Sequence, residues 1–183
     1  MYTEKELVDK LIDLSFAEDI GDGDHTTLCC IPEEARGKSR MIIKEEGILA
    51  GVKIAEEVFN RFDSTLKVEI LINDGTKVKP GDVAMVVEGS VRSLLQTERL
   101  MLNIVQRMSG IATITHKYME LLKGTKAKVL DTRKTTPGMR ILEKMAVKKQ
   151  NKDIINVEIN AIFYFEAPVK EKSTVSVKIS KGT

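Results

Sequence analysis

The chain is organised around residues 128–140, whose sequence is KVLDTRKTTPGMR. Two apolar residues, Val129 and Leu130, are followed at once by polar and charged side chains, so the pattern predicts a short buried strand that ends in a loop. Thr136 and Pro137 predict a helix start, because threonine suits the N-cap and proline suits the first helical position. In α/β proteins, ligands bind beyond the carboxyl ends of strands. We therefore expect this loop to face a ligand.

The side chains of the loop indicate the chemical class of that ligand. Thr132, Arg133 and Lys134 follow one another and supply a hydroxyl and two cations. Planar guanidinium groups pair bidentately with carboxylates, and Lys binds phosphates as a point charge. The pattern favours an anion site, and the alternative is a basic pair on an ordinary solvated surface.

Composition narrows the class of protein. With 183 residues, 42% hydrophobic and 31% charged, the chain can form one domain or two small ones. A net charge of +2 and 4% aromatic residues argue against nucleic-acid binding. The two cysteines, Cys29 and Cys30, are adjacent, a spacing that favours reduced thiols in a cytoplasmic protein. We find neither a secretory apolar region nor the ~20 consecutive apolar residues of a membrane helix, so we expect no membrane association.

The N-terminal part predicts a capped helix followed by a glycine turn. Thr3 and Glu6 have the spacing of a capping box. The apolar stripe that we expect to face the core consists of Leu7, Leu11 and Leu14, widened by Val8 and Ile12. Residues 18–27, EDIGDGDHTT, do not complete a calcium-loop pattern. We interpret them as a turn whose side chains bond to its own backbone rather than as a metal site.

The middle of the chain predicts a small sheet domain. We expect strands at 39–44, 48–51, 66–70 and 83–87, and a helix at 52–62. Asp74-Gly75 is a hairpin signal and Pro80-Gly81 is a second turn signal. Strands that bracket a helix and are joined by tight turns indicate an α+β sheet covered on one side.

A long helix is expected at 93–122, followed by the loop and by a second helix at 137–148. Ser109-Gly110 predicts a bend or a close neighbour in the middle of the long helix. From its position alone, Arg99 on this helix is an exposed side chain paired with Glu98 or another neighbour. The order of helix, strand, loop and helix is typical of the opening of an α/β barrel.

Three segments carry a resemblance to a known family. They are residues 18–27, residues 97–115 with the sequence TERLMLNIVQRMSGIATIT, and residues 131–138 with the sequence DTRKTTPG. From residue 1 to about 148 the chain resembles the quinolinate phosphoribosyltransferases, also called carboxylating nicotinate-nucleotide pyrophosphorylases. The resemblance implies an α+β fold, an N-terminal open α/β sandwich followed by the start of an incomplete α/β barrel. The implied divisions are 1–105 for the sandwich with its linking helix, 106–148 for the beginning of the barrel, and 149–183 for a divergent strand-rich tail.

The resemblance also implies a reaction and its binding residues. Enzymes of this family join quinolinate to phosphoribosyl pyrophosphate with Mg²⁺, and form nicotinate mononucleotide, pyrophosphate and CO2 in NAD biosynthesis. By resemblance, Arg99 reaches the active site of the partner subunit of a homodimer or higher homo-oligomer and binds a substrate carboxylate. Arg133 is a second carboxylate ligand, and Lys134 with Thr132 binds pyrophosphate or phosphate. We identify no catalytic acid–base pair.

The resemblance ends near residue 148. The family continues with a glycine run and Asn-His-Arg, whereas this chain has Lys-Gln-Asn-Lys at 149–152. In the tail, residues 157–159 resemble the family's second barrel strand and nominate Glu158 as a ribose neighbour, and residues 174–180 resemble the last sandwich strand. A shifted reading frame, an internal deletion or a shortened chain would each explain the departure. Three functions stay open: an active phosphoribosyltransferase, a non-catalytic dimerising fragment, or a relative acting on another pyridine or in a metal pathway.

Overall fold

The computed structural model describes residues 2–127 and 129–150. The elements are α1 Glu4–Ile20, α2 His25–Cys30, β1 Arg36–Ile42, β2 Gly47–Ile48, α3 Val52–Phe62, β3 Lys67–Ile70, β4 Lys77–Val78, β5 Val83–Ser90, α4 Val91–Leu122 and α5 Arg140–Gln150. The mixture of helices and open sheets confirms the expected α+β class. Helix α4 runs across the expected domain boundary at residue 105, and the division itself stays a prediction.

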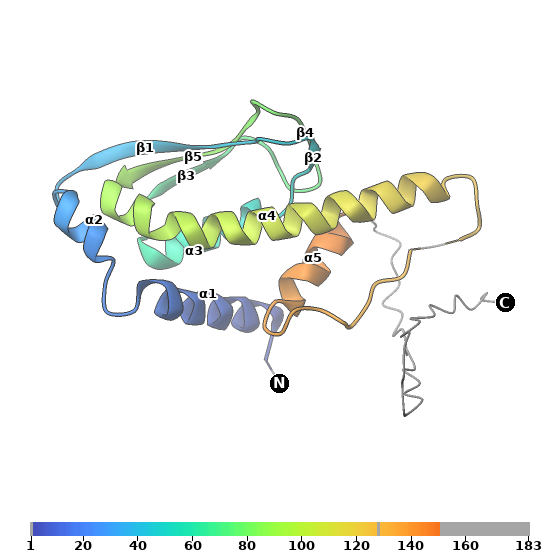
Figure 1. Ribbon diagram of the computed structural model, residues 1–183, viewed down its shortest axis with the longest axis horizontal. Coiled ribbons are helices and arrows are strands. Elements are labelled where there is room, and N and C mark those ends of the chain that lie inside the picture. Colours follow the sequence, from blue (N-terminus) through green and yellow to red (C-terminus); the bar gives the residue numbers. More distant parts are fainter. Residues whose placement is uncertain (1, 128, 151–183) are drawn as a thin grey trace, which may run out of the picture.

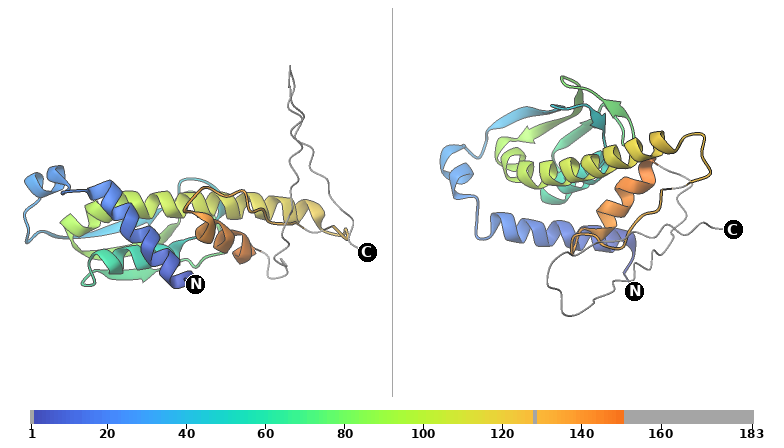
Figure 2. Two further views of the ribbon diagram at one scale, coloured as in Figure 1. Left: turned by 90° about the horizontal axis from the view of Figure 1, so that it is seen from below. Right: turned by 45° about the vertical axis from the view of Figure 1, so that its right-hand side comes forward.

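The sheet has one covered face, as expected for an open sandwich. Strands β1, β5 and β3 form an antiparallel sheet in that order, and β2 pairs with β4 in a second, two-stranded sheet. Figure 1 shows the larger sheet along one side of α4, with α1 and α5 on the other side, and the views in Figure 2 agree. Helix α4 therefore lies at the centre, and both its N-terminal and its middle segments contribute to the core.

The hairpin expected at Asp74-Gly75 is not formed, because β3 pairs with β5 while β4 pairs with β2. The turn residues have other partners. The Asp74 carboxylate accepts a hydrogen bond from the Val52 amide at the start of α3, over 2.8 Å. The Gly75 amide donates to the Leu49 carbonyl over 2.7 Å. The turn thus joins β4 to the β2–α3 corner instead of reversing β3.

Helix α4 passes very close to the segment between β2 and α3. Gly51 has φ 99°, and a Cβ atom there would lie 2.9 Å from Met108 Sδ and 3.4 Å from Val105 Cα. The Ser109 hydroxyl accepts from the Ala50 amide at 3.0 Å and donates to the Ala50 carbonyl at 3.1 Å. The close neighbour expected at Ser109 is therefore confirmed, while α4 continues without interruption.

Helix α1 begins as predicted and buries part of the predicted apolar stripe. The Glu6 amide donates to Thr3 Oγ1 over 3.2 Å, and the Thr3 amide donates to Glu6 Oε2 over 2.7 Å, which confirms the capping box. Val8 and Ile12 are buried, whereas Leu7 is 41% and Leu14 is 70% exposed. Leu11 is partly buried against the same core, so α1 packs on α4 and α5 through a narrower face than expected, centred on Val8 and Ile12.

The barrel strand expected at Val129 and Leu130 is absent from the described structure, and Leu130 is 42% exposed. A parallel strand needs neighbouring strands for its backbone hydrogen bonds, and the described residues supply none at this point. The following helix begins at Arg140 rather than at Pro137. Residues 137–139 instead form a turn, with a hydrogen bond from the Met139 amide to the Thr136 carbonyl.

Among the helices of the described residues, none combines the length and apolarity that crossing a bilayer requires.

Candidate functional site

The segment 131–136, which we call the basic loop, is held in place by cations from α5. Lys144 Nζ lies 2.6 Å from Asp131 Oδ2 in a largely buried ion pair. The Arg140 guanidinium donates through Nη2 to the Arg133 carbonyl and through Nε to the Thr135 hydroxyl, each over 3.1 Å. These contacts fix the loop backbone, although the strand expected before it is not formed.

A second anchor comes from the middle of α4. Arg107 Nε donates to Glu143 Oε1 over 2.9 Å, and Arg107 Nη2 donates to the Thr136 hydroxyl. The Thr136 amide donates to the same Glu143 oxygen over 3.3 Å. Because α5 begins at Arg140 and the Thr136 hydroxyl accepts from Arg107, the expected N-cap at Thr136 is wrong.

Three of the predicted site residues lie together in the basic loop. Thr132, Arg133 and Lys134 are all exposed, and the Lys134 amide donates to Thr132 Oγ1 over 3.1 Å. A guanidinium, an ammonium and a hydroxyl on one anchored turn can bind an anion with several oxygen atoms. The described surface also has a depression over β1, β3 and β5, and none of the predicted residues that the structure describes lines it.

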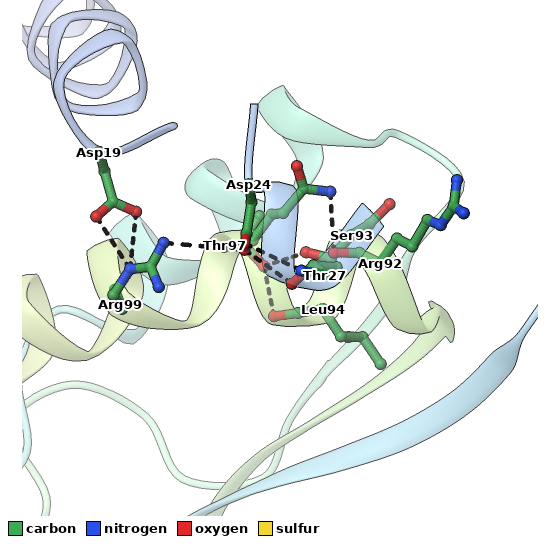
Figure 3. Close-up of polar contacts among 9 residues, drawn as sticks. Asp19, Asp24, Thr27, Arg92, Ser93, Leu94, Thr97 and Arg99 are labelled. Atoms are coloured by element: carbon green, nitrogen blue, oxygen red, sulfur yellow. Dashed lines mark hydrogen bonds and ion pairs between the residues drawn. The ribbon is translucent and has the colours of Figure 1, made fainter. Parts of the chain in front are cut away.

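Arg99 lies apart from the basic loop, near the N-terminal end of α4. Its side chain is 56% exposed, and its Nε lies 3.0 Å and 3.1 Å from the two carboxylate oxygens of Asp19 (Figure 3). The partner is thus an aspartate of α1 and not Glu98. Arg99 is eight residues before Arg107, which is roughly 12 Å along a helix axis. Glu158, the remaining predicted residue, lies outside the described residues.

The acidic turn between α1 and α2 forms the surroundings of Arg99. Asp24 accepts hydrogen bonds from the Thr27 amide at 3.1 Å and the Thr27 hydroxyl at 2.8 Å, so it caps α2. These bonds, with smaller contributions from the charges of Arg99 and His25, hold the pKa of Asp24 below its usual value. The interpretation of residues 18–27 as a turn bonded to its own backbone is therefore confirmed.

Two sequence models of protein domains match the chain in succession. The first is described as "Quinolinate phosphoribosyl transferase, N-terminal domain" and matches residues 24–109. The second describes the C-terminal domain of the same enzyme and matches residues 111–151. The chain belongs to the quinolinate phosphoribosyltransferase family. The resemblance found in the sequence is confirmed, and the match ends close to the point where we expected it to end.

Relatives of known name show the same similarity. The chain is 43% identical to quinolinate phosphoribosyltransferase [decarboxylating] 1b of Nicotiana tabacum over 138 residues, which is 75% of this chain and 39% of the relative. It is 40% identical to a probable carboxylating nicotinate-nucleotide pyrophosphorylase of Bacillus subtilis over 139 residues, 76% of this chain and 48% of the relative. The chain therefore spans less than half the length of these relatives.

Solved structures of the family share the fold. NadC from Streptococcus pyogenes superposes with a TM-score of 0.77 and 36% identity, over 82% of this chain and 53% of that chain. The nicotinate-nucleotide pyrophosphorylase from Francisella tularensis superposes with a TM-score of 0.75 and 38% identity, over the same shares of 82% and 53%. The described fold is thus shared with about half of each of these solved chains.

Several residues that position the candidate site were missed in the sequence. Arg107 lies within the family-like segment 97–115. Its partner Glu143 is 36 residues away, and no local sequence pattern connects the two. Arg140 and Lys144 could have been found, because both lie within ten or so residues of the loop that they hold. The repeated acidic residues at 18–27 were the only sequence feature that could have indicated Asp19 as a partner for a cation.

Proposed function

We propose that this chain takes part in the transfer of a phosphoribosyl group from phosphoribosyl pyrophosphate to quinolinate, forming nicotinate mononucleotide, pyrophosphate and CO2 in NAD biosynthesis. One observation carries the proposal. Thr132, Arg133 and Lys134, the polar residues of the family-like run 131–138, lie on a loop that Arg107, Arg140 and Lys144 anchor. Such anchoring is what an electrostatic binding site needs.

The proposed roles follow from the charges of the substrates. Quinolinate carries two neighbouring carboxylates, and Arg133 and Arg99 supply guanidinium groups for them. Pyrophosphate is a polyanion, which Lys134 and the Thr132 hydroxyl bind. Because the ribose carbon gains positive character as pyrophosphate leaves, orientation and charge placement do most of the work. Loss of CO2 beside the ring nitrogen requires no acid–base pair.

We further propose that two copies of the chain complete the site. Arg99 is 56% exposed, and about two turns of α4 separate it from Arg107, where the basic loop meets the helix. A guanidinium on another copy could fill the position opposite Arg133. The predicted division at residue 105 would then lie on α4, the helix that links the two parts of the site.

Mg²⁺ enters the proposal as an ion carried by the substrate. Within residues 2–127 and 129–150, no three acidic, histidine or cysteine side chains converge on one point. Asp131, the carboxylate within the basic loop, is already paired with Lys144. The described residues therefore do not fit a resident magnesium ion. Mg²⁺ is commonly bound through substrate phosphates with few protein ligands, so we assign no step to it here.

A product assay tests the proposal. We expect the purified 183-residue chain to bind quinolinate but to form no nicotinate mononucleotide by itself, because its sequence after residue 148 does not follow the family. Binding without product would identify a chain that keeps the carboxylate-facing part of the site. Robust turnover would contradict the expected inactivity, and failure to bind quinolinate would favour the relative with another pyridine or a metal pathway.

A second candidate function is association without catalysis. Ile114, Tyr118 and Leu121 are 57%, 58% and 77% exposed, and their spacing places them on one face of α4. A row of large exposed apolar side chains marks an interaction surface or an aggregation risk. This row favours a homodimer or a higher homo-oligomer as the working form.

We propose a cytoplasmic location. Cys29 and Cys30 are exposed free thiols, which a reducing compartment keeps in that state.

A further inference from the structure

We propose that Asp19 is a positioning residue that orients the Arg99 guanidinium for a substrate carboxylate, with Asp24 as a second, longer-range partner. The inference rests on the proposed function of Arg99 and adds a role for the acidic turn at residues 18–27. Residues 18–27 resemble the family, and the proposed reaction assigns no role to them.

The turn brings two carboxylates to one guanidinium because of its glycines. Helix α1 ends at Ile20 and α2 begins at His25, so only four residues connect the two helices. Gly21 has φ 55° and Gly23 has φ 144°, and side-chain-bearing residues adopt these values at a cost. Figure 3 shows the outcome: Asp19 at the end of α1 and Asp24 before α2 both lie beside Arg99 of α4.

Each carboxylate is itself held. Asp24 is largely buried and bonded twice to Thr27, so it cannot swing toward solvent without uncapping α2. Asp19 is the sixteenth of the seventeen residues of α1, so the helix and the turn that follows it hold its backbone on both sides. The two acids therefore form a rigid frame rather than a pair of mobile surface charges.

The geometry leaves one edge of Arg99 available. A guanidinium has five N–H donors, which form one edge through Nε and another through the two terminal nitrogens. Asp19 engages the Nε donor with both of its oxygens, at 3.0 Å and 3.1 Å. The terminal nitrogen Nη2 lies 3.9 Å from Asp24, beyond direct hydrogen-bond distance. Within the described residues, no hydrogen bond occupies the outer edge, so its two terminal nitrogens can donate to a bidentate carboxylate.

Two opposite effects of Asp19 on an incoming dianion have to be separated. Its negative charge weakens the attraction of the site, whereas its hydrogen bonds spare the ligand the cost of ordering a long side chain. The neighbouring Glu18 is exposed and makes no hydrogen bond or ion pair in the described structure. Glu18→Gln therefore removes the same charge one residue away without releasing Arg99. The difference between Asp19→Asn and Glu18→Gln isolates the positioning effect.

The first measurement uses the purified chain without ligand. We expect the Arg99 Nε–H signal in ¹H–¹⁵N spectra to show restricted motion and slow exchange in the wild type, in Glu18→Gln and in the conservative Asp19→Glu variant. In Asp19→Asn the signal should become mobile. Equal mobility of Arg99 in Asp19→Asn and Glu18→Gln would overturn the proposal, whether or not quinolinate binds.

The second measurement is quinolinate affinity by calorimetry. We expect Asp19→Asn to bind about threefold to tenfold more weakly than Glu18→Gln, the cost of ordering one side chain on binding. In an Arg99→Ala background, Asp19→Asn should cause no further loss. An equal loss with and without Arg99 would overturn the positioning role. Absence of binding to the wild type would instead contradict the proposed function, and the Nε–H signal would still decide the role of Asp19.

Discussion

Arg107 on α4 and Glu143 on α5 form a hydrogen-bonded ion pair, with Nε 2.9 Å from Oε1. The Glu143 side chain is only 12% exposed, and its oxygen also accepts from the Thr136 amide at the end of the basic loop. One carboxylate therefore connects α4, α5 and the loop that carries Arg133 and Lys134. The candidate site depends on this connection more than on the strand that the sequence predicted before it.

Removing the guanidinium should loosen this junction. Arg107→Ala leaves the largely buried Glu143 carboxylate without its cation, which should lower the free energy of unfolding by about 1–3 kcal/mol. Lys148→Ala is the matched control, because Lys148 forms a 3.8 Å pair with Glu4 in which both side chains are more than half exposed. The control should change stability by less than about 0.5 kcal/mol. Urea unfolding compares the two, and equal stabilities would contradict the role of the pair.

The close approach of α4 to Gly51 makes a second prediction. Gly51→Ala combines a positive φ with contacts to Met108 and to the Val105 backbone, so it should destabilise the fold by about 2–4 kcal/mol. Gly110→Ala is the control: Gly110 lies within α4, and apart from the neighbouring backbone of that helix no described atom would come within 4 Å of its Cβ. That change should stabilise by about 0.5–1 kcal/mol. Thermal unfolding that moved both variants in the same direction would contradict the packing described here.

Acid should weaken the junction between α3 and α4 through Asp63. Hydrogen bonds from the Ser93 hydroxyl and from Thr65 hold the pKa of Asp63 below its usual value. A carboxyl whose folded pKa is depressed adds stability above its unfolded pKa and loses it as the pH falls through the folded value. The stabilisation by Asp63 is therefore complete above the pKa of an unfolded aspartate, roughly 4, and is lost as the pH falls through the lower folded value.

Ser93→Ala checks this assignment. Because Ser93 supplies the largest contribution, its loss should move the pKa of Asp63 upward, as followed by carboxyl ¹³C shifts during an acid titration. Ser15→Ala serves as the control, since the Ser15 side chain makes no hydrogen bond in the described structure. A titration of Asp63 that is the same in both variants would be inconsistent with the Ser93 bond.

The exposed apolar row of α4 predicts self-association. In sedimentation velocity, the wild-type chain should dimerise or form larger oligomers at micromolar concentration, and Leu121→Lys should shift it to monomer because it places a charge among Ile114 and Tyr118. Gln106→Lys adds the same charge to an exposed position of α4 outside the row and should leave association intact. A monomeric wild type would contradict the prediction that this row forms an interface between copies.

The sequence predicted what local pattern determines. The capping box of α1, the amphipathic α3 and the long α4 follow from spacings within a few turns of helix, and the structure confirms them. The predictions failed where the local structure depends on residues distant in the sequence. Asp74-Gly75 looks like a hairpin until Val52 and Leu49 are seen to bind it, and Val129 becomes a strand only if neighbouring strands exist.

The candidate site divides in the same way. Thr132, Arg133 and Lys134 were identified from one uninterrupted motif, and the structure keeps them together. Arg99 was identified by family likeness, but its partner Asp19 is 80 residues away in sequence, and no spacing rule connects them. Residues that hold other residues in place leave little trace in a single sequence, because their partners are chosen by the fold.

Calorimetric binding of quinolinate to the purified chain tests the central claim most directly. We predict that the wild type binds and that Arg133→Ala weakens binding by about tenfold to a hundredfold, the loss of one charge-assisted contact. Lys126→Ala, an exposed cation in the same connection between α4 and α5, should bind like the wild type. If Arg133→Ala and Lys126→Ala bind quinolinate equally well, the basic loop is not the carboxylate site.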